Sequence, residues 1–167
     1  ANLGAQRLEN GEILPSVTLA YETWGELDEA SSNAVLILHA LTGDAHVCGE
    51  AAPGQPTPGW WEQIVGPGRI IDTDRYYVVA ANVLGGCQGS TGPASLAPDG
   101  APWGSRFPVI STRDQVYAES RLADLLGISE WSIVVGASLG GQRAIEWAVS
   151  YPERVRRLVV VASGAQT

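Results

Sequence analysis

A serine between two glycines is the clearest candidate for chemistry in this sequence. Ser138 stands in the run Gly136-Ala137-Ser138-Leu139-Gly140, which has the Gly-x-Ser-x-Gly spacing of a nucleophile elbow. An elbow of this kind holds a serine at a sharp turn from a strand into a helix, where small neighbours let backbones approach closely. The N–H groups that begin the helix then face any negative charge that develops beside the serine. The pattern indicates a nucleophilic serine, and a serine that only caps a helix is the alternative.

The residues on either side of Ser138 support the nucleophile interpretation. Residues 132–135 are typical of a short buried strand, and residues 139–150 have a helical composition. Tyr151-Pro152 ends the helix, because proline disfavours the α conformation in the residue before it. Residues 158–162 form another continuous apolar run, as in a buried strand of a parallel sheet. The segment is therefore predicted to be a βαβ unit.

Further strands and one more helix are predicted upstream of this unit. Residues 16–24 alternate enough to form an outer strand, whereas residues 34–39 and 76–82 are apolar runs of the central-strand type. A helix is expected over residues 111–126. Its expected buried positions are four apolar residues: Val116, Leu122, Leu125 and Leu126. The alternation of strands and helices predicts an α/β fold, and residues 1–167 contain no repeat or linker, so they are expected to form one domain.

Two long connections rich in glycine and proline interrupt this pattern. Residues 40–59 and 84–111 are longer than a compact fold needs, and long ordered loops at strand ends are more often functional than idle. In open α/β sheets, ligands bind outside the carboxyl ends of the strands. Both loops and Ser138 follow such ends, so we expect the three segments to meet at one rim. Solvated surface turns are the alternative.

The two histidines both precede Ser138. In the α/β-hydrolase order the acid and the histidine follow the nucleophile, so His39 is expected to fix the neighbouring loop by a hydrogen bond rather than to act as the base. His46 lies in a loop and is expected to face solvent, and Asp44 is too close to it in sequence to be the triad acid. Neither histidine has a partner at metal-ligand spacing, so no metal site is expected.

The composition is that of an acidic globular protein. Eighteen acidic and ten basic residues give a formal charge of −8, which repels nucleic acid and anionic membrane surfaces. The sequence has no apolar run as long as a membrane span and no signal-peptide pattern at its start. Cys48 and Cys87 do not make a disulfide framework in a chain of this length. A reducing, cytoplasmic location is therefore expected.

Short motifs spread over residues 21–162 carry a resemblance to a known family. They are His39-Ala40-Leu41-Thr42-Gly43-Asp44-Ala45-His46, Gly59-Trp60-Trp61, Gly66-Pro67-Gly68, Ile71-Asp72-Thr73, Asn82-Val83-Leu84-Gly85-Gly86-Cys87, Gly89-Ser90-Thr91-Gly92-Pro93, Phe107-Pro108, Arg113-Asp114, Glu146-Trp147-Ala148 and Tyr151-Pro152. Together with the elbow they resemble the homoserine O-acetyltransferase family. Members of that family have the α/β-hydrolase fold. They move an acetyl group from acetyl-CoA to the homoserine hydroxyl by way of an acyl-serine, in methionine biosynthesis.

The resemblance implies roles for four residues. Ser138 would be the nucleophile, and the backbone N–H groups of Leu41 and Leu139 would form the oxyanion hole. Thr42 would meet the acceptor amino acid, with a turn-capping threonine as the alternative. The family's elbow usually reads Gly-Gly-Ser-Met-Gly-Gly, and leucine at position 139 keeps the size of methionine and the backbone donor.

The resemblance also bears on what lies outside this chain. The family's helical lid and its triad aspartate and histidine are expected downstream of Thr167. The chain would then be the N-terminal part of a mainly parallel sheet flanked by helices, with the lid and the C-terminal part absent. Acetyl-CoA would be a co-substrate rather than a bound cofactor, L-homoserine would be the acceptor, and the full-length protein would be a homodimer.

Several other functions fit the same residues. Within the fold, a homoserine O-succinyltransferase, a serine O-acetyltransferase and a plain esterase or thioesterase are alternatives. Rapid hydrolysis without dependence on an acceptor would distinguish the esterase. A catalytically dead binding module is an alternative of a different class, since the chain has no histidine after Ser138.

Overall fold

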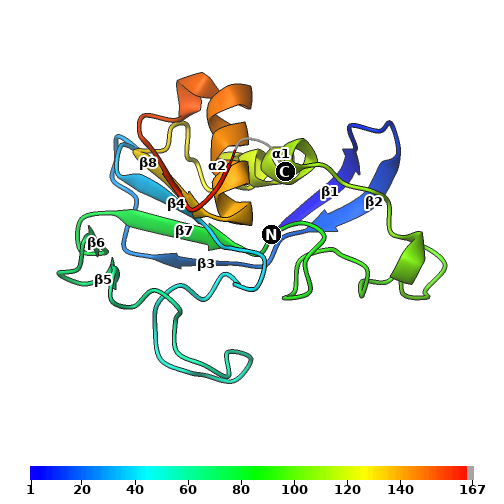
Figure 1. Cartoon of the computed structure of the whole chain (residues 1–167), viewed down its shortest axis with the longest axis horizontal. Helices are drawn as coiled ribbons and strands as arrows, with labels where there is room; N and C mark the ends of the chain where they lie inside the picture. The colour runs from blue at the N-terminus through cyan, green and yellow to red at the C-terminus, as the bar shows by residue number, and fades with distance from the viewer. Residues whose placement is uncertain (165–167) are drawn as a thin grey trace.

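A five-stranded sheet lies at the centre of the computed structural model, which describes residues 1–164 (Figure 1). The strands are β1 (Asn2–Arg7), β2 (Ile13–Thr18), β3 (Tyr21–Trp24), β4 (Ala34–Leu38), β5 (Val65–Gly66), β6 (Ile71–Asp72), β7 (Tyr77–Ala81), β8 (Ile133–Ala137) and β9 (Leu158–Val161). The α-helices are α1 (Thr112–Leu125) and α2 (Leu139–Ser150), and short 3-10 turns cover Gly104–Arg106 and Pro152–Arg154.

The order of strands in the central sheet is β3-β7-β4-β8-β9. β3 runs antiparallel to β7, and the other neighbours are parallel, with Leu36 opposite both Val79 and Val134. Every residue of the middle strand β4 is buried, which explains its continuous apolar run. The α/β prediction is confirmed. The parallel register places the carboxyl ends of β4, β7 and β8 at one rim of the sheet.

Alternate residues of β4 face two separate cores, because successive side chains of a strand point to opposite faces. Leu36 and Leu38 lie in the core that α1, α2 and the β1–β2 hairpin cover. Val35 and Ile37 lie in a second core, which no helix covers. It is closed by Val47 and Cys48 from the first long loop and by Val65 and Ile71 from the short strands β5 and β6. The loop that begins at residue 40 therefore has a structural role on one face of the sheet.

The predicted outer strand over residues 16–24 is wrong, because two strands occupy this stretch. β2 ends at Thr18 and pairs with β1, whereas β3 begins at Tyr21 and joins the central sheet. Between them the backbone N–H groups of Thr18 and Ala20 donate to the hydroxyls of Thr91 and Ser90, at 2.8 and 3.1 Å. These bonds to the second long loop interrupt the ladder, so the chain changes sheets there.

The β1–β2 hairpin is joined to the first turn of α1 (Figure 1). Ser111 and Asp114 form a reciprocal capping box at that turn. The same Asp114 also serves the hairpin, since its carboxylate accepts from the Glu9 amide and its carbonyl accepts from the Gln6 side chain, both at 2.8 Å. One cap thus holds two elements that lie far apart in sequence.

The two helices and the last strand test the remaining predictions. α2 occupies residues 139–150 as predicted, and α1 agrees to within one or two residues. The prediction that Leu125 is buried is wrong, because Leu125 is 63% exposed at the end of α1. β9 is parallel to β8 as predicted but is not buried: its four residues are 36–45% exposed, since within residues 1–164 it has a neighbour on one side only. Neither helix is long and apolar enough to cross a membrane within the described residues.

Candidate active site

Ser138 occupies a strained turn between β8 and α2. Its φ is 52° and its ψ is −121°, and only three non-glycine residues in the described part of the chain have a positive φ. Such a conformation costs on the order of 1–3 kcal/mol and persists where the surroundings enforce it. Here the Ser138 N–H donates to the Val161 carbonyl at 3.0 Å, and its carbonyl accepts from Gly141 and Gln142 at 2.9 and 3.1 Å. The side chain is exposed.

Two glycines of the elbow are required by close backbone contacts. A Cβ at Gly136 would overlap the backbone of Gly140, the second residue of α2. A Cβ at Gly140 would overlap the carbonyl of Leu38 and would lie 2.8 Å from that of His39. The first turn of α2 therefore packs directly on the carboxyl end of β4, and no larger residue fits between them.

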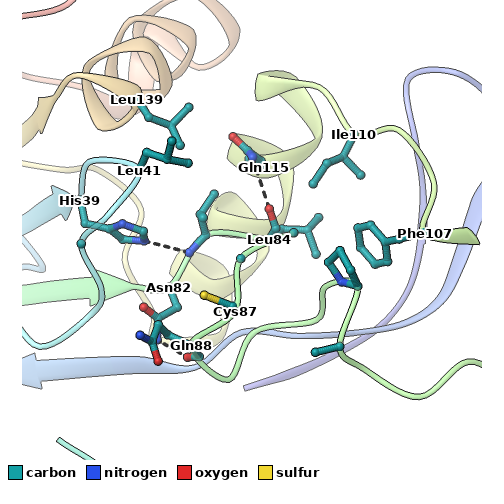
Figure 2. Close-up of a pocket in the computed structure, with 16 residues that line it drawn as sticks. His39, Leu41, Asn82, Leu84, Cys87, Gln88, Phe107, Ile110, Gln115 and Leu139 are labelled. Atoms are coloured by element: carbon teal, nitrogen blue, oxygen red, sulfur yellow. Dashed lines mark hydrogen bonds between the residues drawn. The ribbon is translucent and has the colours of Figure 1, made fainter. Parts of the chain in front are cut away.

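A pocket of about 480 Å³ lies beside this contact, at the carboxyl ends of the parallel strands. Both long loops line it, the first through Leu41 and the second through residues 84–88, Phe107 and Ile110. Figure 2 shows Leu41 and Leu139 on one side of the pocket and Phe107 and Ile110 on the other. The prediction that the two loops and the elbow converge at one rim is confirmed.

Two of the four predicted site residues line the pocket, and the other two are their neighbours in the chain. Leu41 and Leu139 line the same pocket, and Leu139 directly follows Ser138 in the chain. Thr42 directly follows Leu41, and both Ser138 and Thr42 are exposed at the edge of the residues that line the pocket without being among them. Within residues 1–164, no group of three or more histidine, cysteine or acidic residues could hold a metal ion.

His39 is buried and uses both ring nitrogens. Nδ1 lies 2.7 Å from the Ala40 carbonyl, and Nε2 accepts from the Val83 N–H at 3.1 Å. These partners assign the proton to Nδ1 of a neutral ring. Burial and then the positive charge of Arg143 lower the pKa of His39 from 6.5 to about 4, against the Ala40 hydrogen bond and the Asp44 charge. The predicted hydrogen-bonding role is confirmed, and the ring has no free nitrogen with which to act as a base.

The prediction that His46 faces solvent is wrong. His46 is only 7% exposed, and its Nδ1 lies 2.9 Å from a carboxylate oxygen of Glu22 on β3. The other oxygen of Glu22 accepts from the Gln55 side chain at 2.5 Å. Burial alone would lower the pKa of His46, but the hydrogen bond and charge of Glu22 outweigh it and raise the pKa. The next two residues, Val47 and Cys48, are apolar and lie in the second core, so His46 is also held in the interior.

A buried ion pair next to the end of β4 is the feature that the sequence analysis missed. Arg143 of α2 is 0% exposed, and its Nη1 lies 2.5 Å from Glu119 of α1. The other carboxylate oxygen of Glu119 accepts from the Trp147 indole at 2.8 Å. Arg143 Nη2 donates to the carbonyl of His39, also at 2.8 Å. The available signal was an arginine beside Ala144 and four residues before Trp147, on the apolar face of the predicted helix.

The two cysteines lie in different environments. Cys48 is buried in the second core, and burial, followed by the charges of Glu62 and Glu22, raises the pKa of its thiol to about 11. Cys87 is exposed and lines the pocket beside the elbow. Both thiols are free. Only Cys87 is therefore accessible to a reagent that enters the pocket.

Comparison with known proteins identifies close relatives. Residues 33–167 match the α/β hydrolase fold family. A homoserine O-acetyltransferase from Thermobifida fusca (strain YX) is 66% identical over 158 residues, which cover 95% of this chain and 42% of that protein. The crystal structure of a homoserine O-acetyltransferase from Bacillus anthracis has a TM-score of 0.93 at 34% identity, over 99% of this chain and 46% of that one.

An esterase crystal structure is equally similar in shape. Its TM-score is 0.93 at 37% identity, and the similarity covers 99% of this chain and 47% of that one. This chain thus spans less than half the length of each of these three relatives. The similarity covers nearly all of this chain and part of each of the two homoserine O-acetyltransferases. Because the family match contains the strained serine turn, the strands on both sides of it and the pocket, the chain belongs to the α/β-hydrolase fold family.

Proposed function

We propose that the full-length protein carrying this chain is a homoserine O-acetyltransferase, which moves an acetyl group from acetyl-CoA to the hydroxyl of L-homoserine. The observation that carries the proposal is the placement of Ser138. It sits exposed on a strained turn, beside a pocket lined by Leu41 and Leu139. The 66% identity to a protein named homoserine O-acetyltransferase supports homoserine as the acceptor and acetyl as the group transferred.

The proposed reaction has two acyl-transfer steps. In the first, Ser138 Oγ bonds to the acetyl carbonyl carbon, the thioester C–S bond breaks, and the CoA thiolate takes up the proton that the serine loses. In the second, the homoserine hydroxyl attacks the acyl-serine, its proton is removed, and Ser138 Oγ leaves and is reprotonated. The N–H groups of Leu41 and Leu139 stabilise the oxyanion of both tetrahedral intermediates, and loss of one such donor costs on the order of 10²–10³ in turnover.

The proton must be handled by a group outside this chain. Both ring nitrogens of His39 are engaged, and the Nδ1 atom of His46 pairs with Glu22 on the side of the sheet that the first long loop covers. Since the chain spans 42% of its relative from Thermobifida fusca, we expect the triad histidine and aspartate in the rest of the full-length protein. The same part would supply the lid that keeps water from the acyl-enzyme.

An esterase is the second candidate, because an esterase structure has the same TM-score of 0.93. The elbow, the oxyanion donors and the acyl-serine would serve hydrolysis equally well. The two activities differ in what attacks the acyl-enzyme, which is homoserine in the transferase and water in the esterase. Partition of the acyl-enzyme between these acceptors therefore separates the candidates.

The test uses radiolabelled acetyl-CoA and the full-length protein. We expect label on the peptide that contains Ser138, and its complete loss in Ser138→Ala. The matched control is Ser129→Ala, an exposed serine that precedes β8 at the opposite end of the strand from the elbow. Label that persists in Ser138→Ala would reject the nucleophile. Label that is discharged to water as fast without homoserine as with it would favour the esterase.

A further inference from the structure

Arg143 is a fully buried charge that reaches three segments around the candidate active site. Its guanidinium pairs with Glu119 of α1, and its Nη2 donates to the His39 carbonyl at the carboxyl end of β4. Arg143 itself belongs to α2, the helix that begins immediately after Ser138. One side chain therefore links both helices to the strand end from which the first long loop leaves.

Each proposed oxyanion donor lies close in sequence either to Arg143 itself or to the carbonyl that Arg143 binds. The N–H of Leu139 is at the start of α2, four residues before Arg143. The N–H of Leu41 lies two residues after His39, whose carbonyl Arg143 binds at 2.8 Å. Figure 2 shows the backbone running from His39 to Leu41 along the side of the pocket that Leu139 also lines. The link therefore joins the two sides of the proposed oxyanion hole.

A second observation places the same two backbones in contact. The close approach of Gly140 to the carbonyls of Leu38 and His39 leaves no room for a Cβ. Gly140 thus sets how near α2 comes to the strand end, and the directional bond from Arg143 sets the orientation of the His39 peptide. Orientation matters here, because an oxyanion donor must point at the place where charge develops.

Stability alone is a weak reason for this ion pair. Removing two charges from water is costly, and well-packed apolar residues often replace a buried pair without loss of stability. A planar guanidinium is suited to a different task, because it can serve a carboxylate and a carbonyl at once in fixed directions. The guanidinium of Arg143 serves the carboxylate of Glu119, on the neighbouring helix, and the carbonyl of His39, which precedes the candidate oxyanion loop.

We propose that Arg143 is a positioning residue for the oxyanion hole, which holds the Leu41 N–H in register with the Leu139 N–H through its bond to the His39 carbonyl. The inference rests on the proposed acyl transfer at Ser138. Arg143 is buried and acts through the backbone, so it touches no substrate. Its loss lowers the rate of acylation and leaves the binding of acetyl-CoA nearly unchanged.

The test compares Arg143→Met with Val116→Ala in the full-length protein. Val116 is a fully buried residue of α1 in the same core, and its truncation destabilises the protein without altering the bond to His39. We expect Arg143→Met to acylate Ser138 roughly 10- to 100-fold more slowly, because misplacement by about 1 Å costs 10²-fold. The KM for acetyl-CoA should stay within about threefold of wild type, and Val116→Ala should acylate at the wild-type rate.

A second readout separates positioning from general loss of structure. A methyl trifluoromethyl ketone forms a tetrahedral adduct with an active serine, and the adduct carries the oxyanion. Its inhibition constant should rise in Arg143→Met by the same factor as the acylation rate falls, as expected for a lost transition-state interaction. It should be unchanged in Val116→Ala. A parallel loss in both variants would overturn the proposal.

Arg143→Lys keeps the test decisive should Arg143→Met fail to fold. Lysine preserves the charge opposite Glu119 but not the fixed fork, so we expect slower acylation with KM unchanged. Wild-type acylation in Arg143→Lys would then reject the positioning role. If the wild-type protein itself is not acylated, the proposed function fails. If it is acylated and the arginine variants match it, only the present inference fails.

Discussion

The backbone N–H of Val83 donates to Nε2 of His39, so the loop that follows β7 is tied to the end of β4 through one imidazole ring. The opposite ring nitrogen faces the Ala40 carbonyl at 2.7 Å. With both nitrogens occupied, the ring is fixed in one tautomer and one orientation. His39 therefore joins the two loops that line the pocket.

We expect His39 to remain neutral from pH 5 to pH 8, because burial and the Arg143 charge lower its pKa to about 4. The folded-state pKa lies below the unfolded value of 6.5, so the unfolded chain binds the proton first as the pH falls. The associated stability is present above pH 6.5 and is lost between pH 6.5 and 4, to the extent of roughly 3 kcal/mol. Nitrogen-15 NMR should show an Nδ1–H ring throughout, and a titration near pH 6.5 would contradict the assignment.

Replacing Gly140 with alanine should disrupt the elbow. The new Cβ would overlap the carbonyl of Leu38, which is backbone and cannot rotate away. We expect a loss of about 4 kcal/mol or more in the free energy of unfolding, together with loss of acylation. Gly127→Ala is the control, since it has open space and only its φ of +74° to strain. That control should cost about 1 kcal/mol in denaturant unfolding, and equal losses in both variants would contradict the overlap.

The Glu22–His46 pair should make the first long loop sensitive to pH. Glu22 raises the pKa of His46 in the folded state, so the pair adds stability below the unfolded pKa of 6.5 and loses it as pH rises through the folded pKa. Limited proteolysis within residues 40–59 should therefore be faster at pH 8 than at pH 6. Glu22→Gln should remove this difference, whereas Glu26→Gln, at an exposed position, should retain it.

Alkylation of Cys87 should inhibit acyl transfer. Cys87 is exposed and lines the pocket with Leu41 and Leu139, so an added carboxamidomethyl group would occupy space beside the elbow. Mass spectrometry should find Cys87 modified by iodoacetamide, and Cys48 unmodified until the protein unfolds, because its thiol is buried with a pKa of about 11. Cys87→Ser should be active and resistant. Full activity of the alkylated wild-type protein would show that the pocket is not used.

Local patterns in the sequence predicted the elements nearest to Ser138 well. α2 has the predicted bounds because Gly136 and Gly140 fix its start and Pro152 follows its end, and Ser111 caps α1 through a spacing of three residues. The convergence of the loops followed from a general rule about strand ends. In each case the determining interactions lie within a few residues of one another or follow from the parallel sheet.

The missed features depend on partners that are distant in sequence. The buried His46 pairs with Glu22, 24 residues earlier, and Arg143 reaches the His39 carbonyl across 104 residues. Neither partner can be identified from periodicity, because an isolated histidine in a loop or an arginine in a helix usually faces solvent. The exposure of β9 was missed for a related reason, since an apolar run does not reveal how many neighbours its strand has.

The double use of Asp114 has a consequence for the order of folding. Its bonds to Gln6 and Glu9 close chain segments of 108 and 105 residues, whereas its capping box with Ser111 closes a segment of only three residues. Closing a long segment lowers the entropy of the chain before any contact stabilises the closed form. Contacts between residues so far apart in sequence therefore form slowly. We therefore expect the cap to form early with α1 and the β1–β2 hairpin to dock late. Substitutions in the hairpin should then accelerate unfolding and leave the folding rate nearly unchanged.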